Sequence, residues 1–121
     1  WLGAAKGAGV EFVVVSPTRA DAPEFLGAQW MAIRPNTDTA LMLGIAHTLI
    51  AERLHDEAFL ARHCTGFERL RDYVLGAADG VARTPDWAAS LCEVPADAIR
   101  TLARRLAADH LHDDARASHG P

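Results

Sequence analysis

The sequence predicts an α/β protein, in which helices cover a parallel sheet. One observation is the short run of residues 11–15, which is apolar and rich in valine, as is typical of a strand buried in a parallel sheet. A second is the long apolar stretch of residues 38–54, which has the length of a helix and follows a proline. A third is the series of shorter helical patterns after it. Strands that alternate with helices are typical of α/β folds.

The first third of the chain contains both predicted strands. Residues 1–6 are predicted to form a helix that the following glycines end, and residues 11–15 form the strand. Residues 21–27 are expected to be a loop or one short helical turn. Residues 29–33 are a possible second strand, because Pro35 then ends the extended run.

The rest of the chain is predicted to be helical. Apolar residues fall on nearly every face of residues 38–54, which indicates a buried helix. Asp56 and Thr84 are expected to cap the helices that follow them. The later helices are predicted at residues 57–63, 67–75 and 85–92, and from residue 96 onward.

These elements define the fold class as α/β: a fragment of a parallel-sheet, Rossmann-like domain with one or two short strands and about five helices. The chain has 121 residues, half of them hydrophobic, which is sufficient for a core. So few strands cannot complete a sheet, so we expect a piece of a larger protein. Residues 1–108 are predicted to be its α/β part, and the acidic, histidine-rich residues 109–121 a loosely ordered tail.

Several functional classes are disfavoured. The net charge of −4 and the scattered arginines argue against a nucleic-acid partner. The glycines near the first strand precede it, whereas those of an NAD-type fingerprint follow the strand, and no phosphate-binding loop ending in Lys-Ser or Lys-Thr is present. No membrane-spanning segment is predicted.

The sequence indicates no catalytic residue and no metal site of its own. His47, His55 and His63 are spaced evenly, but Asp56 starts a new helix between the last two. The cysteines lack the spacing of a metal or redox motif. We therefore look for a binding site rather than a self-sufficient active site.

Two polar segments are candidate binding sites. Ligands of α/β proteins gather at the carboxyl ends of strands, which favours the residues directly after the first strand: Ser16, Pro17, Thr18 and Arg19. The second segment, just before the apolar helix, comprises Asn36, Thr37 and Asp38. The first is equally interpreted as an ordinary turn, and the second as plain helix capping.

Six stretches of the sequence, taken in order, resemble the molybdopterin-dependent oxidoreductases of the dimethyl sulfoxide reductase family. The similarity covers residues 1–108 and is greatest to the branch that reduces sulfoxides and N-oxides, including biotin sulfoxide reductase. The stretches are residues 14–19, 34–49, 54–60, 65–67, 87–89 and 94–100.

The resemblance implies a large enzyme in which molybdenum is held by two molybdopterin guanine dinucleotides, written molybdenum bis(molybdopterin guanine dinucleotide). It implies that Ser16, Pro17, Thr18 and Arg19 lie along the nucleotide and that Asn36, Thr37 and Asp38 meet the guanine. The family often carries an acidic or other polar residue at the position of Ser16. A serine makes fewer hydrogen bonds to a ribose diol than a carboxylate does.

We therefore expect a segment of a molybdenum oxidoreductase whose partners are the remainder of the same enzyme and a small sulfoxide or N-oxide. The resemblance places the metal ligand elsewhere, so the isolated chain is predicted to be inactive. Two alternatives remain open: a non-enzymatic helical interaction module and a free-standing nucleotide-binding domain. Members of the family occur in the periplasm and in the cytoplasm, and the sequence gives no compartment.

Overall fold

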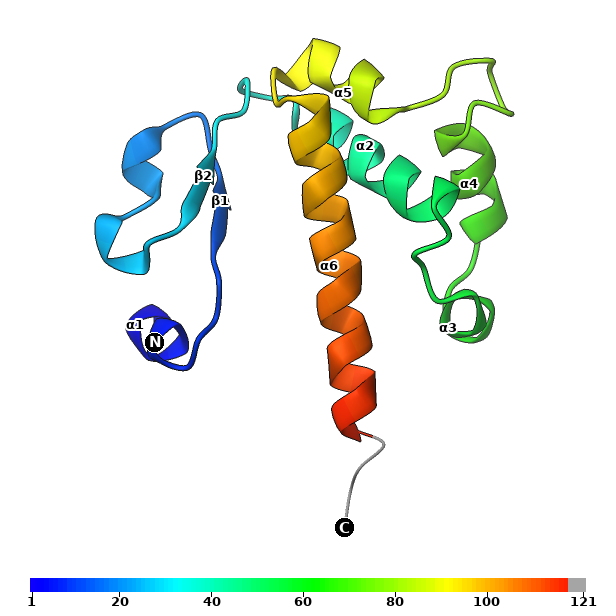
Figure 1. Cartoon of the computed structure of the whole chain (residues 1–121). Coiled ribbons are helices and arrows are strands. Elements are labelled where there is room, and N and C mark those ends of the chain that lie inside the picture. Colours follow the sequence, from blue (N-terminus) through cyan, green and yellow to red (C-terminus); the bar gives the residue numbers. More distant parts are fainter. Residues whose placement is uncertain (118–121) are drawn as a thin grey trace.

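The computed structural model describes residues 1–117, with side chains described for residues 1–108, and it has the predicted α/β class (Figure 1). The described part contains six α-helices, two short 3-10 helices and a sheet of two parallel strands. In chain order these are α1 (Leu2–Gly7), β1 (Val13–Val15), η1 (Arg19–Asp21), η2 (Glu24–Leu26), β2 (Gln29–Met31), α2 (Asp38–Ala51), α3 (Glu57–His63), α4 (Phe67–Val74), α5 (Pro85–Cys92) and α6 (Ala96–Ala117).

The two strands are shorter than predicted and run parallel in register. Val13 lies opposite Gln29, and Val15 lies opposite Met31. The expectation that the first strand is buried on both faces is wrong for this chain: Val13 and Val14 are half-buried and Val15 is 38% exposed. The reason is that β1 has one neighbouring strand in the described part of the chain, and no helix there covers its open face.

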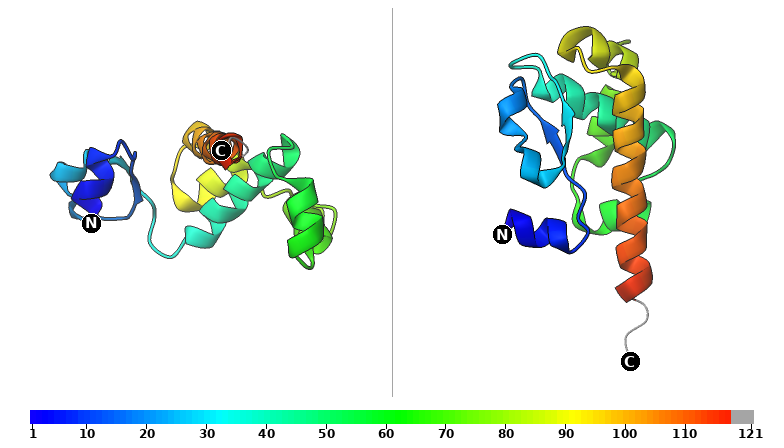
Figure 2. Two further views of the ribbon diagram at one scale, coloured as in Figure 1. Left: turned by 90° about the horizontal axis from the view of Figure 1, so that it is seen from below. Right: turned by 60° about the vertical axis from the view of Figure 1, so that its left-hand side comes forward.

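The strands and the helices α2 to α6 occupy different parts of the molecule (Figures 1 and 2). The small N-terminal unit of α1, β1, η1, η2 and β2 lies at one end, and α3 and α4 lie at the other. Between them, α2 packs against α5 and against the long helix α6. A linker of six residues, 32–37, connects the carboxyl end of β2 to the start of α2.

Helix α2 begins at the predicted residue, Asp38, and ends at Ala51, three residues before the predicted end. Its buried residues are Ala40, Leu41, Gly44, Thr48 and Ile50. The prediction of burial on nearly every side is only partly right, because the Met42 side chain is 59% exposed.

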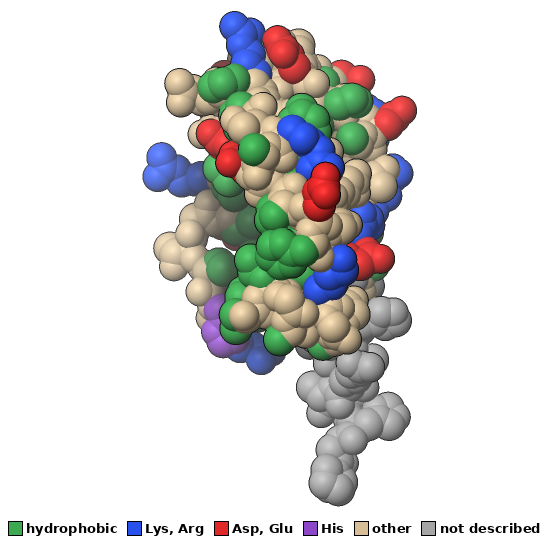
Figure 3. Space-filling view, turned by 90° about the vertical axis from the view of Figure 1, so that its left-hand side faces the viewer, with side chains coloured by type: hydrophobic (Ala, Val, Ile, Leu, Met, Phe, Trp, Pro, Cys, Tyr) green, Lys and Arg blue, Asp and Glu red, His purple; other side chains and the backbone are tan. Residues whose placement is uncertain are grey.

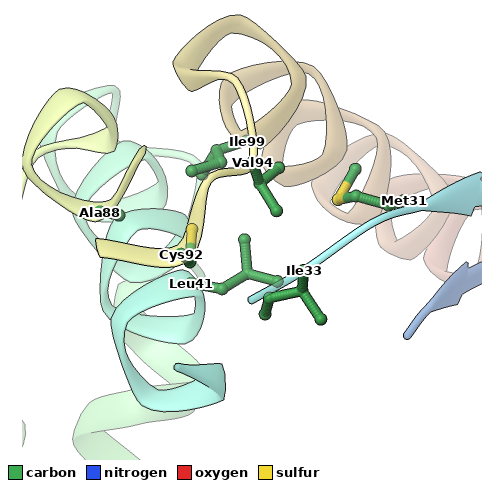
Figure 4. Close-up of a cluster of buried hydrophobic side chains, with 7 residues drawn as sticks. All are labelled: Met31, Ile33, Leu41, Ala88, Cys92, Val94 and Ile99. Atoms are coloured by element: carbon green, nitrogen blue, oxygen red, sulfur yellow. The ribbon is translucent and has the colours of Figure 1, made fainter. Parts of the chain in front are cut away.

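A cluster of buried apolar side chains joins the sheet to the helices (Figure 4). Side chains from the end of β2 and the linker after it meet side chains of α2, α5 and α6. The backbone N–H of Arg34 donates to the Cys92 carbonyl oxygen at 2.9 Å, which ties the same linker to α5. The cluster comprises Met31, Ile33, Leu41, Ala88, Cys92, Val94 and Ile99.

Two predicted helix caps are present. The Phe59 backbone N–H donates to the Asp56 carboxylate at 2.8 Å at the start of α3. The Trp87 backbone N–H donates to the Thr84 hydroxyl at 3.1 Å at the start of α5, where Pro85 is the first helical residue. Both contacts satisfy a backbone donor that the helix itself leaves free.

The last helix continues past the predicted boundary at residue 108 to Ala117. Ion pairs attach its described part to the rest of the chain: Arg104 to Glu52, and Arg105 to Glu11. The loose attachment expected for residues 109–121 stays a prediction, and its residues 118–121 lie outside the described part of the chain.

We predict that Gly44→Ala destabilises the protein, although alanine is the better helix former by about 1 kcal/mol. A Cβ at Gly44 would lie 2.7 Å from the Ala88 Cβ and 3.4 Å from the Ile99 Cγ2, so α2 and α5 must move apart. Overpacking of this kind costs about 1–3 kcal/mol. The matched control is Gly3→Ala in α1, where nothing described lies within 4 Å and helix propensity alone acts. Thermal unfolding should show a lower midpoint for Gly44→Ala only; an unchanged or higher midpoint for it would contradict this packing.

Candidate functional site

The two predicted polar segments follow the carboxyl ends of the two strands, the first directly and the second after a linker. Ser16 directly follows β1, and the linker to Asp38 directly follows β2. Because β1 and β2 are parallel and in register, their carboxyl ends meet at one edge (Figure 1). This is the edge at which α/β proteins gather ligands. The chain therefore leaves both strands at one edge, and residues 36–38 lie beyond the linker that starts there.

A network of hydrogen bonds fixes the loop after β1. Ser16 is 7% exposed, and its backbone N–H donates to the Met31 carbonyl oxygen at 3.2 Å. Its hydroxyl oxygen accepts from the Thr18 backbone N–H at 3.1 Å, and the hydroxyl donates to the Asp21 carboxylate. The Trp30 indole N–H donates to the Ser16 carbonyl oxygen at 3.0 Å. Both hydrogen bonds of the Ser16 hydroxyl are thus made within the loop.

Pro17, Thr18 and Arg19 are exposed in the same loop. The Arg19 guanidinium carbon lies 5.7 Å from the centre of the Trp30 ring, within the range of a cation–π contact. The guanidinium also donates to the Ala22 carbonyl oxygen at 2.9 Å. These contacts hold a positive charge at the edge of the sheet.

Asp21 and Trp30 also belong to this site, although neither is among the residues predicted from the sequence. Asp21 falls at the start of residues 21–27, which are expected to be a loop or one short helical turn, and the short helix η1 turns its carboxylate back onto Ser16. The signal that was available is the Ser16–Thr18 spacing, because a serine hydroxyl often accepts from the backbone N–H two residues later. Such a turn predicts that the loop folds back on itself.

The second segment does not cap α2 with a side chain. Thr37 is the capping residue by backbone position, but its hydroxyl donates to the Arg34 carbonyl oxygen at 2.6 Å instead. Asn36 has a left-handed backbone, with φ of 62°, and its side chain is exposed like that of Asp38. The alternative that these residues serve as plain side-chain caps is therefore wrong. Two polar side chains stand exposed at the start of a helix.

The predicted residues lie outside four hollows of the molecule. These four hollows, in residues 1–108, have volumes of about 670, 640, 540 and 260 Å³, and the seven predicted residues line none of them. The hollow of about 640 Å³ lies between the end of α2, α3 and α4, away from the sheet edge. The face that carries the N-terminal unit shows hydrophobic side chains interspersed with acidic and basic ones (Figure 3).

The three evenly spaced histidines are not gathered into a metal site. In residues 1–108, His, Cys, Asp and Glu side chains form no group of three that could hold a metal ion. Burial, and after it the charge of Arg100, lowers the pKa of His47. The His55 ring packs against Phe67, with ring centres 5.2 Å apart. No helix of the described chain combines the length and the apolar character needed to cross a membrane.

A hydrogen-bonded ion pair lies far from the sheet edge, in the loop between α4 and α5. The Arg83 guanidinium, 7% exposed, binds the Asp79 carboxylate through two hydrogen bonds and stacks 3.8 Å from the centre of the Tyr73 ring. The hydrogen bonds from Arg83 lower the pKa of Asp79 to about 2. This pair closes the loop between α4 and α5.

Sequence relatives of the chain are curated enzymes that are much longer. The chain is 44% identical over 105 residues to the dimethyl sulfoxide/trimethylamine N-oxide reductase of Cereibacter sphaeroides, a match that covers 87% of this chain and 13% of the relative. It is 44% identical over 98 residues to the biotin sulfoxide reductase of the same organism, covering 81% of this chain and 13% of that enzyme. No protein-family model matches the chain.

A solved structure shows the same arrangement of elements. Acetylene hydratase from Pelobacter acetylenicus superposes with a TM-score of 0.69 at 31% sequence identity. The superposition covers 83% of this chain and 13% of the hydratase. The chain thus spans about one eighth of the length of the proteins that it matches.

Proposed function

The chain belongs to the dimethyl sulfoxide reductase family, and on that premise we propose that it holds the guanosine end of a molybdopterin guanine dinucleotide within a larger enzyme. The larger enzyme is proposed to reduce sulfoxides or N-oxides by oxygen-atom transfer and to bind molybdenum through two such dinucleotides. The names of two relatives, a dimethyl sulfoxide/trimethylamine N-oxide reductase and a biotin sulfoxide reductase, support this substrate class. The bound molybdenum supplies the redox chemistry, and this chain supplies binding and orientation.

The observation that carries the proposal is the exposed Asp38 at the start of α2, where no side chain caps the helix. Guanine presents two adjacent N–H donors, and a carboxylate offers two acceptors, so the two groups can form a pair of charge-assisted hydrogen bonds. The positive end of the helix dipole favours the ionised carboxylate. The exposed Asn36 adds an amide that both donates and accepts. The donor and acceptor set therefore fits a guanine.

The loop after β1 supports the same proposal from the neighbouring strand. Pro17, Thr18 and Arg19 are exposed at the edge from which the guanine-binding segment also leaves the sheet. Arg19 carries a positive charge that suits the phosphate groups of a dinucleotide. In this proposal residues 16–19 lie along the nucleotide and residues 36–38 meet its base.

The two alternative functions have less support. A non-enzymatic helical module would use the helix faces, and it leaves the polar residues at the sheet edge without a role. A free-standing nucleotide-binding domain would need a sheet that closes its own core, whereas β1 is half-exposed in the described part of the chain. The length of the relatives favours a segment that works within a larger enzyme.

The test of the proposal is the cofactor content of the complete enzyme that carries this segment. Purified enzyme should contain molybdenum and, after acid hydrolysis, release guanine nucleotide. Metal analysis and chromatography of the released nucleotides measure both. Enzyme that is active but releases adenine or cytosine nucleotide, or no nucleotide, would contradict the proposal.

We predict that the isolated 121-residue chain does not reduce dimethyl sulfoxide or biotin sulfoxide. Its described residues hold polar groups suited to one end of the cofactor, and they form no cluster suited to a metal. The measurement is turnover of either sulfoxide with a reduced dye as electron donor, with the complete enzyme as positive control. Turnover by the purified chain above the rate of the dye alone would refute this prediction.

A further inference from the structure

The hydrogen bonds of the loop after β1 give Ser16 and Asp21 different roles. A serine hydroxyl has one hydrogen to donate, and that of Ser16 is donated to the Asp21 carboxylate. The hydroxyl oxygen also accepts from the Thr18 backbone N–H, and the residue is 7% exposed. Ser16 therefore has no donor left for a ligand and little surface on which to meet one.

Asp21, in contrast to Ser16, is accessible to a ligand. It is exposed, and Ser16 fixes it through the Oδ2 oxygen alone. No hydrogen bond from the described residues reaches its Oδ1 oxygen, although an ionised carboxylate can accept about four hydrogen bonds. The side chain is thus an anchored acceptor with most of its capacity free. Arg19 lies at the other end of η1, held on the Trp30 ring, so the loop also presents a positive charge.

We propose that Asp21 is the ligand-binding carboxylate of this loop, that it accepts hydrogen bonds from the sugar hydroxyls of the bound nucleotide, and that Ser16 is its positioning residue. This inference rests on the proposed function, because it takes the guanine to lie against residues 36–38. Because β1 and β2 are parallel and end at the same edge, the loop with Asp21 and the linker to residues 36–38 both leave the sheet there. A carboxylate in the loop after β1 therefore suits the sugar of a nucleotide whose base lies against residues 36–38.

The test measures how fast variants of the complete enzyme lose their own bound dinucleotide, as guanine nucleotide that stays with the protein after timed incubation and gel filtration. Asp21→Asn keeps an oxygen for the Ser16 hydroxyl but loses the charge, and we expect roughly tenfold faster loss. The matched control is Glu24→Gln in the adjacent turn η2, an exposed acidic residue that should retain nucleotide like the wild type.

A second measurement separates positioning from direct binding. Ser16→Ala should speed nucleotide loss and also expose the Thr18 amide to hydrogen exchange, since Ser16 is its acceptor. Asp21→Asn should speed nucleotide loss while the Thr18 amide stays protected.

The outcomes also separate this inference from the proposed function. Wild-type retention by Asp21→Asn, together with rapid loss by Asp38→Asn, would overturn the role of Asp21 and leave the proposed function standing. Wild-type retention by both variants would overturn both. Faster loss by Ser16→Ala with wild-type retention by Asp21→Asn would show that Ser16 meets the ligand itself, contrary to the inference.

Discussion

Asp38→Asn in the complete enzyme is expected to lose the guanine dinucleotide nearly as readily as Asp38→Ala. The amide turns one of the two acceptors into a donor, which then faces a donor of the guanine. Unpairing polar groups that the bound guanine covers in this way costs about 2–4 kcal/mol. The measurement is the molybdenum and guanine nucleotide content of each purified variant.

The comparison of asparagine with aspartate separates base recognition from helix capping. As a cap, asparagine is about as good as aspartate, so a residue that only capped α2 would tolerate the change. Asp56 provides the control, because its carboxylate does cap α3 by accepting from the Phe59 N–H. The complete enzyme with Asp56→Asn should retain its cofactor. Wild-type cofactor loading in Asp38→Asn would leave a local structural role as the better explanation.

Ile99→Ala is expected to destabilise the packing of α6 on α2 and α5 by about 2–5 kcal/mol. Ile99 is fully buried, and it belongs to the cluster that joins the end of β2 to the three helices (Figure 4). Truncation removes buried apolar atoms and leaves a cavity beside Gly44, where the backbones of α2 and α5 approach closely. The first turn of α2, which starts at Asp38, contributes Leu41 to this packing.

The graded control is Ile99→Val, which removes one methylene and should cost about 0.5–1.5 kcal/mol. Hydrogen exchange of peptides from α2 and α5 in the complete enzyme reports on the local opening of this cluster. Protection should fall slightly in Ile99→Val and strongly in Ile99→Ala. Wild-type protection in Ile99→Ala would contradict the assignment of Ile99 to the core.

Local signals in the sequence predicted much of the fold. The starts of α2, α3 and α5 follow from residues that break or cap a helix, such as Pro35, Asp56 and Thr84, because these act within a few positions of themselves. The valine-rich strand was found for the same reason, although the structure shortens it to Val13–Val15. The parallel pairing of the two strands agrees with the predicted parallel sheet.

Contacts between segments could not be predicted from the sequence. The Thr37 hydroxyl donates to the Arg34 carbonyl oxygen and does not cap the start of α2. This contact depends on the path of the linker after β2. The contact between Ser16 and Asp21 depends on the turn η1, which no strong pattern marks. The exposure of Val15 and Met42 reflects what the described chain places beside them, which the composition of a strand or helix does not reveal.

A crystal structure of the complete enzyme with its bound dinucleotide tests the central claim most directly, through the distances from the two Asp38 carboxylate oxygens to the guanine ring nitrogen and exocyclic amine. The proposal predicts two charge-assisted hydrogen bonds of about 2.7–2.9 Å, with α2 starting beneath the base. A guanine bound elsewhere, with the Asp38 carboxylate instead accepting from backbone N–H groups of α2, would contradict it.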